Sequence, residues 1–412
     1  MCVDSSTLSV TYADTSYHYY FCASSHQSQT KGLGVKGLPH RNRGSGLGTM
    51  APPRTYFGCM SLFESLSMKP NLFDYDIKHD VFSLVERSGV DIESLRGKRV
   101  LVTGGTGFFG VWLLSALSSI KRTLGGELEI VVITRSSAAF LSKARRIALD
   151  DDIELIQGDV QEIKFAGGGI THLVHMATTN ASETFAGEDQ LNKLKVLYDG
   201  TKNVLEQCSN KLENVLFTSS GVAYGASGSE KITELEPAAI DTTDLASSLA
   251  IGKIAAEYLV SFYAAKLDYR FTIARCFTFA GQHLPTDLHY AFGNFVNNAL
   301  RGEDIVITGD GLDMRSYLYI GDAVSWLLRM LVEPKNQLLN VGSEHSLSVR
   351  ELADLIAKHT GVGVQILGKR SEIGNFKRAN YIPNTTKARS LYHGLEEWTH
   401  IDTIIQKMLD VK

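Results

Sequence analysis

A glycine-rich turn is the first place in this sequence where residue types and spacing could do chemistry. Gly104, Gly107 and Gly110 stand three residues apart, directly after the apolar run 99–103 and before an amphipathic stretch that starts at Phe108. Glycine lets backbone N–H groups approach a phosphate closely, and the N-terminus of a helix favours an anion. Because the turn lies between a predicted strand and a predicted helix, it predicts a bound dinucleotide pyrophosphate.

Other motifs that carry chemistry are weak or absent in the sequence. His172 and His175 form an HxxH pair, but the strand period points them to opposite faces, so we expect no metal site. The sequence contains no CxxC, HExxH or GxSxG motif, which argues against thiol-redox, zinc-protease and serine-hydrolase chemistry. Cys276 follows a predicted strand, and we expect it to pack in the core.

The elements that must position these residues alternate along the chain. The predicted strands are the short, β-branched apolar runs 99–103, 129–134, 153–156, 172–176, 214–218 and 269–274. The predicted helices between them are 108–121, a stretch that follows residue 134 and runs to about 148, 190–209 and 252–267. Strands alternating with helices of this length imply right-handed βαβ units. We therefore predict an α/β fold built on a Rossmann-type doubly wound parallel sheet.

The C-terminal part has shorter and more mixed elements than the rest. We predict a dinucleotide-binding Rossmann domain over 98–275 and a smaller mixed α/β substrate-binding part over 276–412, whose elements can cross back to the sheet. A short lead-in, 60–97, precedes both. One helix in the second part is well marked, because Ser348 and Glu351 form a capping box ahead of apolar positions.

Composition and charge narrow the classes of function. The 412 residues are 44% hydrophobic, with 41 Lys and Arg against 45 Asp and Glu and a net charge of −4. This composition excludes collagen-like and disulfide-framework proteins. The balance of charges indicates no surface for binding nucleic acid or an anionic membrane. No apolar run is expected to cross a bilayer. Cys208 and Cys276 lie far apart in the sequence, so we expect a cytoplasmic protein.

The first 59 residues differ from the rest in composition. They hold two acidic residues against five basic ones, and three of the five cysteines. We expect 1–59 to be a disordered extension, because its Gly-rich and basic segment has no hydrophobic period. A start codon placed too early, before Met50 or Met60, is the preferred interpretation of this extension. A transit peptide is the alternative.

Beyond the glycine turn, a series of ordered motifs resembles the extended short-chain dehydrogenase/reductases, the epimerase/dehydratase family that modifies nucleotide sugars. The motifs are Gly158-Asp159-Val160, Val174-His175-Met176-Ala177, Gly200-Thr201-Lys202-Asn203-Val204-Leu205, Thr218-Ser219-Ser220-Gly221-Val222-Ala223-Tyr224-Gly225, Arg315-Ser316-Tyr317-Leu318-Tyr319 with Asp322, Asn340-Val341-Gly342-Ser343 and Tyr381-Ile382-Pro383-Asn384. They run through nearly the whole chain from about residue 98 to 407, which makes the resemblance specific.

The resemblance implies which residues bind the ligands. Those implied to bind the cofactor are Gly104, Thr106, Gly107, Phe108, Phe109, Gly110, Arg135, Asp159, Val160, Met176, Ala177, Thr178 and Lys253. Those implied to bind a nucleotide-diphosphate sugar are Thr278, Asn294, Arg315 and Arg378, of which the Arg315 guanidinium would grip the diphosphate. We also expect the protein to form a homodimer.

The catalytic positions depart from the family pattern. Family members use a Tyr hydroxyl, a Lys four residues later and a Ser or Thr, here matched by Leu249, Lys253 and Ser220. Leucine has no proton to exchange. Three explanations stay open: catalysis is lost and binding kept, the chemistry is altered, or another group serves as the base. For the last, Lys253 itself, His283 or a water held by Ser220 are candidates, whereas we expect Tyr224 to be a packing residue near the nicotinamide.

Two further departures narrow the reaction. Family dehydratases follow the active-site Thr with Asp and Glu, whereas this chain has Gly221 and Val222, which cannot transfer protons. A dehydratase mechanism of that kind is therefore not expected, and the small apolar pair looks more like the epimerases. Where epimerases usually carry Asn this chain has Thr278, so the sugar is not identified.

The cofactor follows from the end of the second predicted strand. A carboxylate there would accept from the ribose 2′-hydroxyl, but the chain has Arg135 and no acid in Thr134-Arg135-Ser136-Ser137, which favours NADP over NAD. The predicted function is an NAD(P)-dependent nucleotide-sugar epimerase/dehydratase-type enzyme that transiently oxidises a sugar hydroxyl. The alternative is a catalytically impaired dinucleotide-binding protein.

Overall fold

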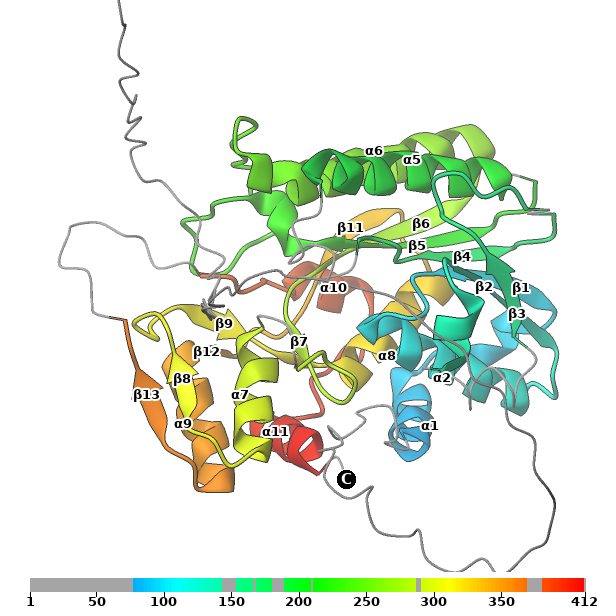
Figure 1. Ribbon diagram of the computed structural model, residues 1–412. Helices are drawn as coiled ribbons and strands as arrows, with labels where there is room; N and C mark the ends of the chain where they lie inside the picture. Colours follow the sequence, from blue (N-terminus) through cyan, green and yellow to red (C-terminus); the bar gives the residue numbers. More distant parts are fainter. Residues whose placement is uncertain are drawn as a thin grey trace, which may run out of the picture. The chain divides into compact units, whose positions relative to one another are not determined.

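The computed structural model describes residues 77–142, 153–165, 168–179, 189–208, 210–286, 290–368 and 380–410 (Figure 1). The predicted extension 1–59 and residues 60–76 of the predicted lead-in lie outside this part of the chain. The rest of the lead-in folds as α1 (Lys78–Ser88) and the short 3-10 helix η2 (Ile92–Leu95), which precede the first strand.

Within the described residues, seven parallel strands form the central sheet. In chain order they are β1 (Lys98–Thr103), β2 (Leu128–Thr134), β3 (Glu154–Gln157), β4 (His172–His175), β5 (Asn214–Ser220), β6 (Arg270–Cys276) and β11 (Gln337–Val341). Their order across the sheet is β11-β6-β5-β4-β1-β2-β3, and every neighbouring pair is parallel. The predicted doubly wound α/β fold is confirmed, and the order reverses between β1 and β4, where sheets of this kind bind ligands.

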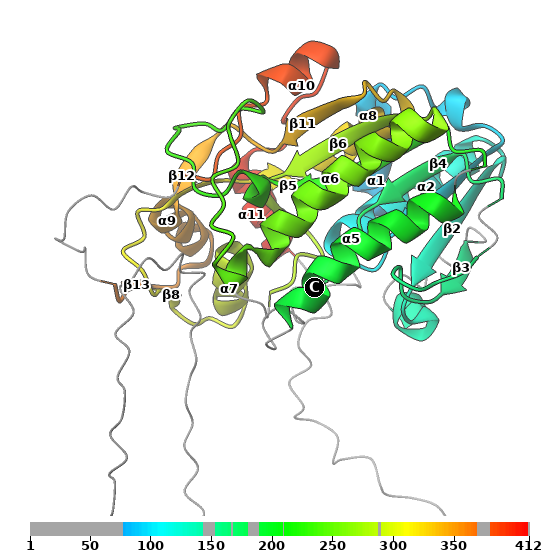
Figure 2. The same cartoon turned by 90° about the horizontal axis from the view of Figure 1, so that it is seen from above.

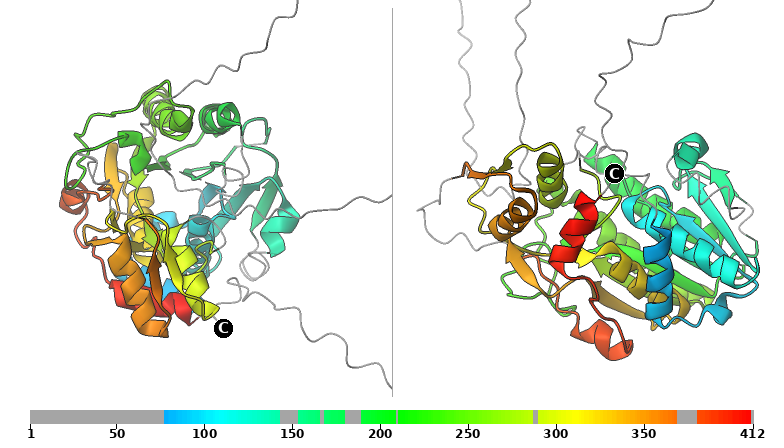
Figure 3. Two further views of the ribbon diagram at one scale, coloured as in Figure 1. Left: turned by 60° about the vertical axis from the view of Figure 1, so that its left-hand side comes forward. Right: turned by 90° about the horizontal axis from the view of Figure 1, so that it is seen from below.

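Helices cover both faces of this sheet, which is why its strands are almost continuously apolar. On one face α5 (Gln190–Gln207) and α6 (Ser248–Leu267) lie side by side (Figure 2). On the other face lie α1, α2 (Phe108–Thr123) and α8 (Ile320–Val332) (Figure 3). The side chains of β1 alternate between the two cores: Val100 and Val102 pack on the α2 side, and Leu101 packs on the α5 side.

The helix boundaries agree with the predictions except at two places. The start of α6 lies at Ser248, four residues before the predicted start, because a 3-10 turn η4 (Leu245–Ser247), capped by the Asp244 side chain, leads directly into it. The helix predicted to follow residue 134 and run to about 148 begins near residue 137 and is described only to residue 142. The predicted capping box is confirmed, because the Ser348 hydroxyl accepts from the Glu351 N–H and the Glu351 carboxylate accepts from the Ser348 N–H.

The C-terminal part is mixed, as predicted, and built from short elements. Its strands are β7 (Phe279–Ala280), β8 (Ile305–Ile307), β9 (Met314–Ser316), β10 (Leu318–Tyr319), β12 (Ser346–Ser348) and β13 (Val364–Ile366). Its helices are α7 (Ala291–Leu300), α9 (Val349–Thr360), α10 (Thr386–Leu391) and α11 (Ile401–Leu409). The strands pair as β10–β7, β12–β9 and β13–β8, and α7, α9, β8 and β13 gather at the left of Figure 1. Two elements, β11 and α8, return to the central sheet, and the domain boundary at residue 276 stays a prediction.

One helix is long and apolar enough to be compared with a membrane span. The stretch Leu245–Leu267 has 23 residues and meets the length and composition of such a span. This finding differs from the expectation, drawn from the sequence, that no apolar run of this kind is present. In the fold α6 packs against α5 and β5, and 44% of the apolar window is buried. Its Lys253 and Glu257 side chains are buried and make hydrogen bonds to β5, as expected for a helix that packs on a sheet.

Candidate functional site

The glycine turn joins β1 to α2 at the carboxyl edge of the sheet. Gly104 has a φ of +75°, and a Cβ there would lie 2.9 Å from the carbonyl carbon of Met176, after β4. A Cβ on Gly110 would lie 2.5 Å from the Gly104 carbonyl oxygen. Both glycines are therefore required by the close packing of the turn itself, as the spacing predicts.

Gly107 is different, because nothing in the described part of the chain requires a glycine there. It is exposed, it has an ordinary negative φ, and a Cβ would meet its nearest protein atom, the Gly104 carbonyl oxygen, at 3.4 Å. α2 begins directly after Gly107 without a side-chain hydrogen bond to cap its first turn. The first N–H groups of α2 are not capped by a side chain, and the glycine before them has no side chain. Such a helix N-terminus can bind a phosphate group. Thr106 and Phe108 flank this position, and the Phe109 ring packs edge-on against Phe279 at 4.8 Å.

The other predicted cofactor residues lie at the same edge of the sheet. Arg135 directly follows β2 and is exposed. Asp159 follows β3, and its carboxylate accepts a 2.9 Å hydrogen bond from the Gln161 N–H, while Val160 is buried. Met176, Ala177 and Thr178 follow β4. The Thr103 hydroxyl, at the end of β1, accepts from the Met176 and Ala177 N–H groups at 3.1 Å each, so the ends of β1 and β4 are tied together.

Lys253 connects α6 to the end of β5. Its Nζ donates a 2.7 Å hydrogen bond to the Thr218 carbonyl oxygen and lies 5.1 Å from the centre of the Phe217 ring. Burial lowers the pKa of Lys253 to about 8. Ser220, the last residue of β5, is partly buried, and its Oγ accepts from the Val222 N–H at 3.3 Å. The structure therefore brings Lys253 to the strand that carries Ser220.

Leu249, which is predicted from the sequence to take the place of a family Tyr, lies one helical turn before Lys253 in α6. It is partly exposed. Residues four apart share one face of a helix. The face of α6 that carries Lys253 therefore carries an aliphatic side chain one turn earlier.

The sequence-based predictions did not include the buried polar network that lies beside Lys253. The Arg275 guanidinium makes two hydrogen bonds to the Glu257 carboxylate, at 2.9 and 2.7 Å, and the Ser219 hydroxyl donates to the same carboxylate. Burial disfavours the charged guanidinium, but the Glu257 carboxylate holds the pKa of Arg275 above its usual value. The sequence offered one signal for this pair. Glu257 stands one turn after Lys253, and Arg275 stands in an otherwise apolar strand, and two opposite charges that are buried must pair with each other.

Tyr224 and Asn340 extend this network toward the C-terminal part. The Tyr224 ring is fully buried beneath the Arg275 guanidinium, 4.3 Å from its centre, and its hydroxyl donates to the Asn340 Oδ1 at 2.7 Å. Burial raises the pKa of Tyr224 to about 12. These contacts agree with the expectation that Tyr224 packs rather than acts as a base.

The residues predicted to bind the sugar nucleotide come from several elements. Arg315 lies on β9, partly buried, and its guanidinium donates to the Met314 carbonyl oxygen at 2.8 Å. Thr278 precedes β7, and its carbonyl oxygen accepts from the Leu318 N–H. Asn294 lies in α7, which packs against α9 and α11. Arg378 lies outside the described residues.

The two histidines of the HxxH pair go to different places, as predicted. His175 is buried between the Thr103 and Thr201 hydroxyls, at 2.9 and 3.0 Å, and burial lowers its pKa to about 3. His172 contacts Asn214 instead. Among the described residues, no group of His, Cys, Asp and Glu side chains could hold a metal ion. Cys276 is buried and unpaired with another cysteine, and burial raises the pKa of its thiol to about 12.

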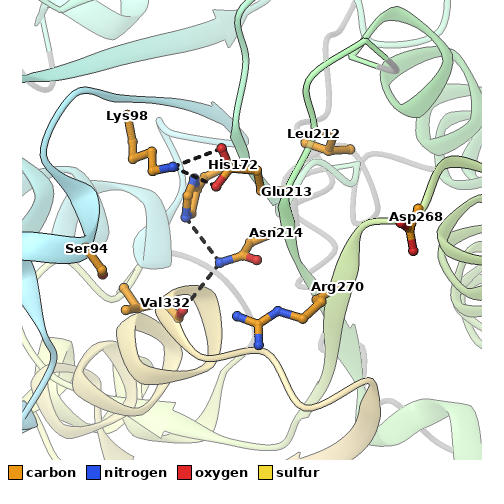
Figure 4. A pocket seen from close by; sticks show the side chains of 9 residues that line it. All are labelled: Ser94, Lys98, His172, Leu212, Glu213, Asn214, Asp268, Arg270 and Val332. Carbon is orange, nitrogen blue, oxygen red and sulfur yellow. Dashed lines mark hydrogen bonds and ion pairs between the residues drawn. The ribbon is translucent and has the colours of Figure 1, made fainter.

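A pocket of about 470 Å³ lies at the opposite, amino edge of the sheet (Figure 4). Lys98 and Asn214, the first residues of β1 and β5, line it. Four of its lining side chains contact one another in pairs, since Lys98 pairs with Glu213 at 2.7 Å and His172 contacts Asn214 at 3.2 Å. The glycine turn, Lys253 and Ser220 all lie at the other ends of these strands, so the candidate site is at the carboxyl edge.

Comparison with known proteins identifies the family. The family described as NAD dependent epimerase/dehydratase matches residues 100–342, more than half of the chain. The chain belongs to this family. The resemblance to the extended short-chain dehydrogenase/reductases, and with it the expectation of a nucleotide-sugar family that binds NAD(P), is confirmed.

Similar proteins include decarboxylases and epimerases. UDP-glucuronic acid decarboxylase 6 of Arabidopsis thaliana is 27% identical over 268 residues, covering 65% of this chain and 76% of that protein. UDP-N-acetyl-alpha-D-glucosaminuronate decarboxylase of Bacillus cytotoxicus is 29% identical over 269 residues, covering 64% of this chain and 80% of that protein. The solved structure of UDP-glucuronic acid 4-epimerase from Bacillus cereus in complex with NAD has a TM-score of 0.64 at 20% identity, covering 76% of this chain and 98% of that one. At that identity the structural likeness shows the fold alone.

Proposed function

We propose that this protein is an NAD(P)-dependent enzyme that modifies a nucleotide-diphosphate sugar and begins by oxidising a sugar hydroxyl. One observation carries the proposal: the glycine turn, Lys253 and the Ser220 end of β5 lie at the same carboxyl edge of one parallel sheet. Ligands of open α/β sheets bind at this edge, next to the reversal of strand order.

Each of these groups has a distinct task in the proposed reaction. The bare backbone at Gly107 leaves the first N–H groups of α2 open to a pyrophosphate. The bound dinucleotide supplies the oxidising power. Lys253, with a pKa of about 8, carries its charge near neutral pH and can donate to the ribose hydroxyls. Ser220 can hydrogen-bond the sugar oxygen that loses its proton.

The proposed substrate site lies between the two parts of the chain. Arg315 would hold the diphosphate, since a guanidinium presents a planar fork of donors to phosphate oxygens. Thr278, Asn294 and Arg378 are the further residues proposed to contact the sugar nucleotide. The relatives named above act on UDP-linked uronic acids, so UDP-glucuronic acid is the first compound to try. Gly221 and Val222 offer no acid or base, which supports epimerase-type rather than dehydratase-type chemistry.

The second candidate function is a dinucleotide-binding protein without catalysis, and Leu249 is the observation that favours it. Purified protein separates the two. A panel of UDP-, dTDP-, CDP- and GDP-sugars, incubated with NAD and NADP and followed by mass spectrometry and NMR, should reveal one altered sugar nucleotide. If the cofactor binds and every sugar is returned unchanged, the enzymatic proposal fails and the binding function stands.

Arg135 supports a preference for NADP. It is exposed directly after β2, where a guanidinium can meet a 2′-phosphate. Affinities for NAD and NADP, measured by calorimetry on the wild type and on Arg135→Asp, test the proposal. We expect the substitution to weaken NADP binding about tenfold or more and to leave NAD binding within a fewfold. An equal effect on both cofactors would contradict it.

We also propose that the protein is a homodimer that pairs through α5 and α6. Their outer sides expose Leu191 and Tyr198 on α5 and Tyr258 and Phe262 on α6, with 42–67% of each residue accessible. The spacing of each pair places both side chains on one face of its helix, and clustered apolar exposure of this kind is typical of interaction surfaces. Light scattering should give the mass of a dimer, and Phe262→Glu should give a monomer.

A further inference from the structure

One phenol reaches the candidate site from the C-terminal part of the chain. The hydroxyl oxygen of Tyr381 lies 2.6 Å from the position that a Cβ would take on Gly221. Gly221 is buried and directly follows Ser220. The Tyr381 ring is partly buried and packs against the Phe277 ring, with 4.8 Å between their centres. The missing side chain at Gly221 therefore leaves the space that this hydroxyl fills.

The backbone of Tyr381 is fixed beside Arg315. The two residues are partners in a parallel β-bridge, and the Tyr381 N–H donates to the Met314 carbonyl oxygen at 3.4 Å. Tyr381 thus lies between the arginine proposed to hold the diphosphate and the end of β5 that carries Ser220.

We propose that the Tyr381 hydroxyl is the proton-transfer group of this enzyme, in place of the phenol that Leu249 cannot supply. The inference deepens the proposed function and rests on it. Tyr224 is not suited to the task, because its ring is fully buried and its hydroxyl is bonded to Asn340. Tyr381 combines partial exposure with a place next to Ser220.

The proton balance of the step is simple. The O–H bond of the sugar hydroxyl breaks, and its proton passes to the phenolate oxygen of Tyr381, forming a phenol. The carbon would be oxidised to a carbonyl, with its hydrogen and both electrons of the C–H bond passing to the oxidised nicotinamide dinucleotide that the site would hold. On the return step the carbonyl is reduced and Tyr381 gives the proton back, so that no other reactant is needed for epimerisation.

Tyr381→Phe in the full chain, loaded with cofactor, is the first test. General acid–base catalysis commonly contributes about 10²- to 10⁴-fold. We expect kcat to fall by at least about 10² on the sugar nucleotide that the panel identifies, with its Kd within about threefold of the wild type. The limb of the pH–rate profile that rises with pH should disappear. Tyr290→Phe, which alters an exposed tyrosine, should change neither quantity.

Rescue distinguishes proton transfer from a structural role. Adding Leu249→Tyr to Tyr381→Phe restores a phenol one helical turn from Lys253. We expect the kcat of this double variant to be at least about tenfold higher than that of Tyr381→Phe alone. A purely structural defect at Tyr381 would not respond to a phenol placed on α6. A rate within threefold of the wild type in Tyr381→Phe alone overturns the proposal.

A readout that does not depend on turnover completes the test. In protein labelled with ¹³Cζ-tyrosine, the Tyr381 signal is assigned by its loss in Tyr381→Phe. We expect it to shift when UDP-glucuronic acid or UDP-glucose is added, and to shift much less with UDP, which lacks the sugar. If the sugar nucleotides bind and the signal does not move, Tyr381 does not contact the sugar and the proposal is wrong. If Tyr381 senses the sugar but no panel member is altered, it is the proposed function that fails, and the proton-transfer role fails with it.

Discussion

The Nζ of Lys253 and the carbonyl oxygen of Thr218 are joined by a buried hydrogen bond of 2.7 Å. This bond fixes α6 to β5 two residues before Ser220, so the helix and the strand present their polar groups to the same place. The arrangement has an energetic consequence. Burial lowers the pKa of Lys253 to about 8. The folded protein therefore disfavours the protonated form of Lys253, the form that would donate to the ribose hydroxyls of a dinucleotide.

Lys253→Met should separate function from stability. We expect the affinity for NAD or NADP to fall about tenfold or more. The melting temperature at pH 7 should not fall, because the loss of a buried charge offsets the loss of the bond to Thr218. Calorimetry and thermal unfolding of the two proteins check this.

The pH dependence of the same comparison has a defined sign. A lysine whose pKa is lowered by folding contributes stability above its unfolded pKa of about 10.4 and loses it as the pH falls through about 8. The wild type should therefore gain stability relative to Lys253→Met as the pH rises from 8 to about 10.4. A constant difference across that range would show that Lys253 is not disfavoured as a cation.

Gly107→Val and Gly110→Ala form a matched pair that tests the phosphate site. At Gly107 the nearest protein atom to a new Cβ is 3.4 Å away, so the fold should be kept while the side chain blocks the pyrophosphate. At Gly110 a Cβ would lie 2.5 Å from backbone atoms, and overpacking of this kind costs about 1–3 kcal/mol. Retained cofactor in folded Gly107→Val would contradict the assignment.

How much of this could be predicted from the sequence depends on how local each feature is. The strand, turn and helix around Gly104 are encoded within a few residues of each other, so their type and spacing were readable. The pairing of Glu257 with Arg275 joins α6 to β6, and no local pattern reports it. Tyr381 reaches Gly221 from 160 positions along the chain, and only folding brings the two together. The early start of α6 is different, because it follows from a local feature: Asp244 caps the turn that leads into Ser248, only four residues away.

The Glu257–Arg275 pair should be important for stability. The two side chains are 8% and 10% exposed, and removing one partner of a buried pair costs about 3–5 kcal/mol because the other charge is left uncompensated. Arg275→Met should lower the free energy of unfolding by this amount in denaturant melts, and adding Glu257→Gln should recover part of the loss. Lys98→Met, which breaks the more exposed pair with Glu213, should cost about 1 kcal/mol or less.

Arg315→Met tests the proposed grip on the substrate diphosphate. Hydrogen bonds to charged groups are worth about 1.5–3 kcal/mol, so the Kd of the sugar nucleotide should rise roughly 10- to 150-fold, while the cofactor affinity and melting temperature stay close to wild type. Arg301→Met is the matched control, because this exposed arginine pairs with Glu303 at the end of α7. Titration with UDP alone distinguishes contact with the diphosphate from contact with the sugar. If Arg315 holds the diphosphate, its loss should weaken the binding of UDP and of UDP-sugars alike. A loss confined to the sugar-bearing ligand would move Arg315 from the diphosphate to the sugar, and an unchanged Kd for both would remove it from the substrate site.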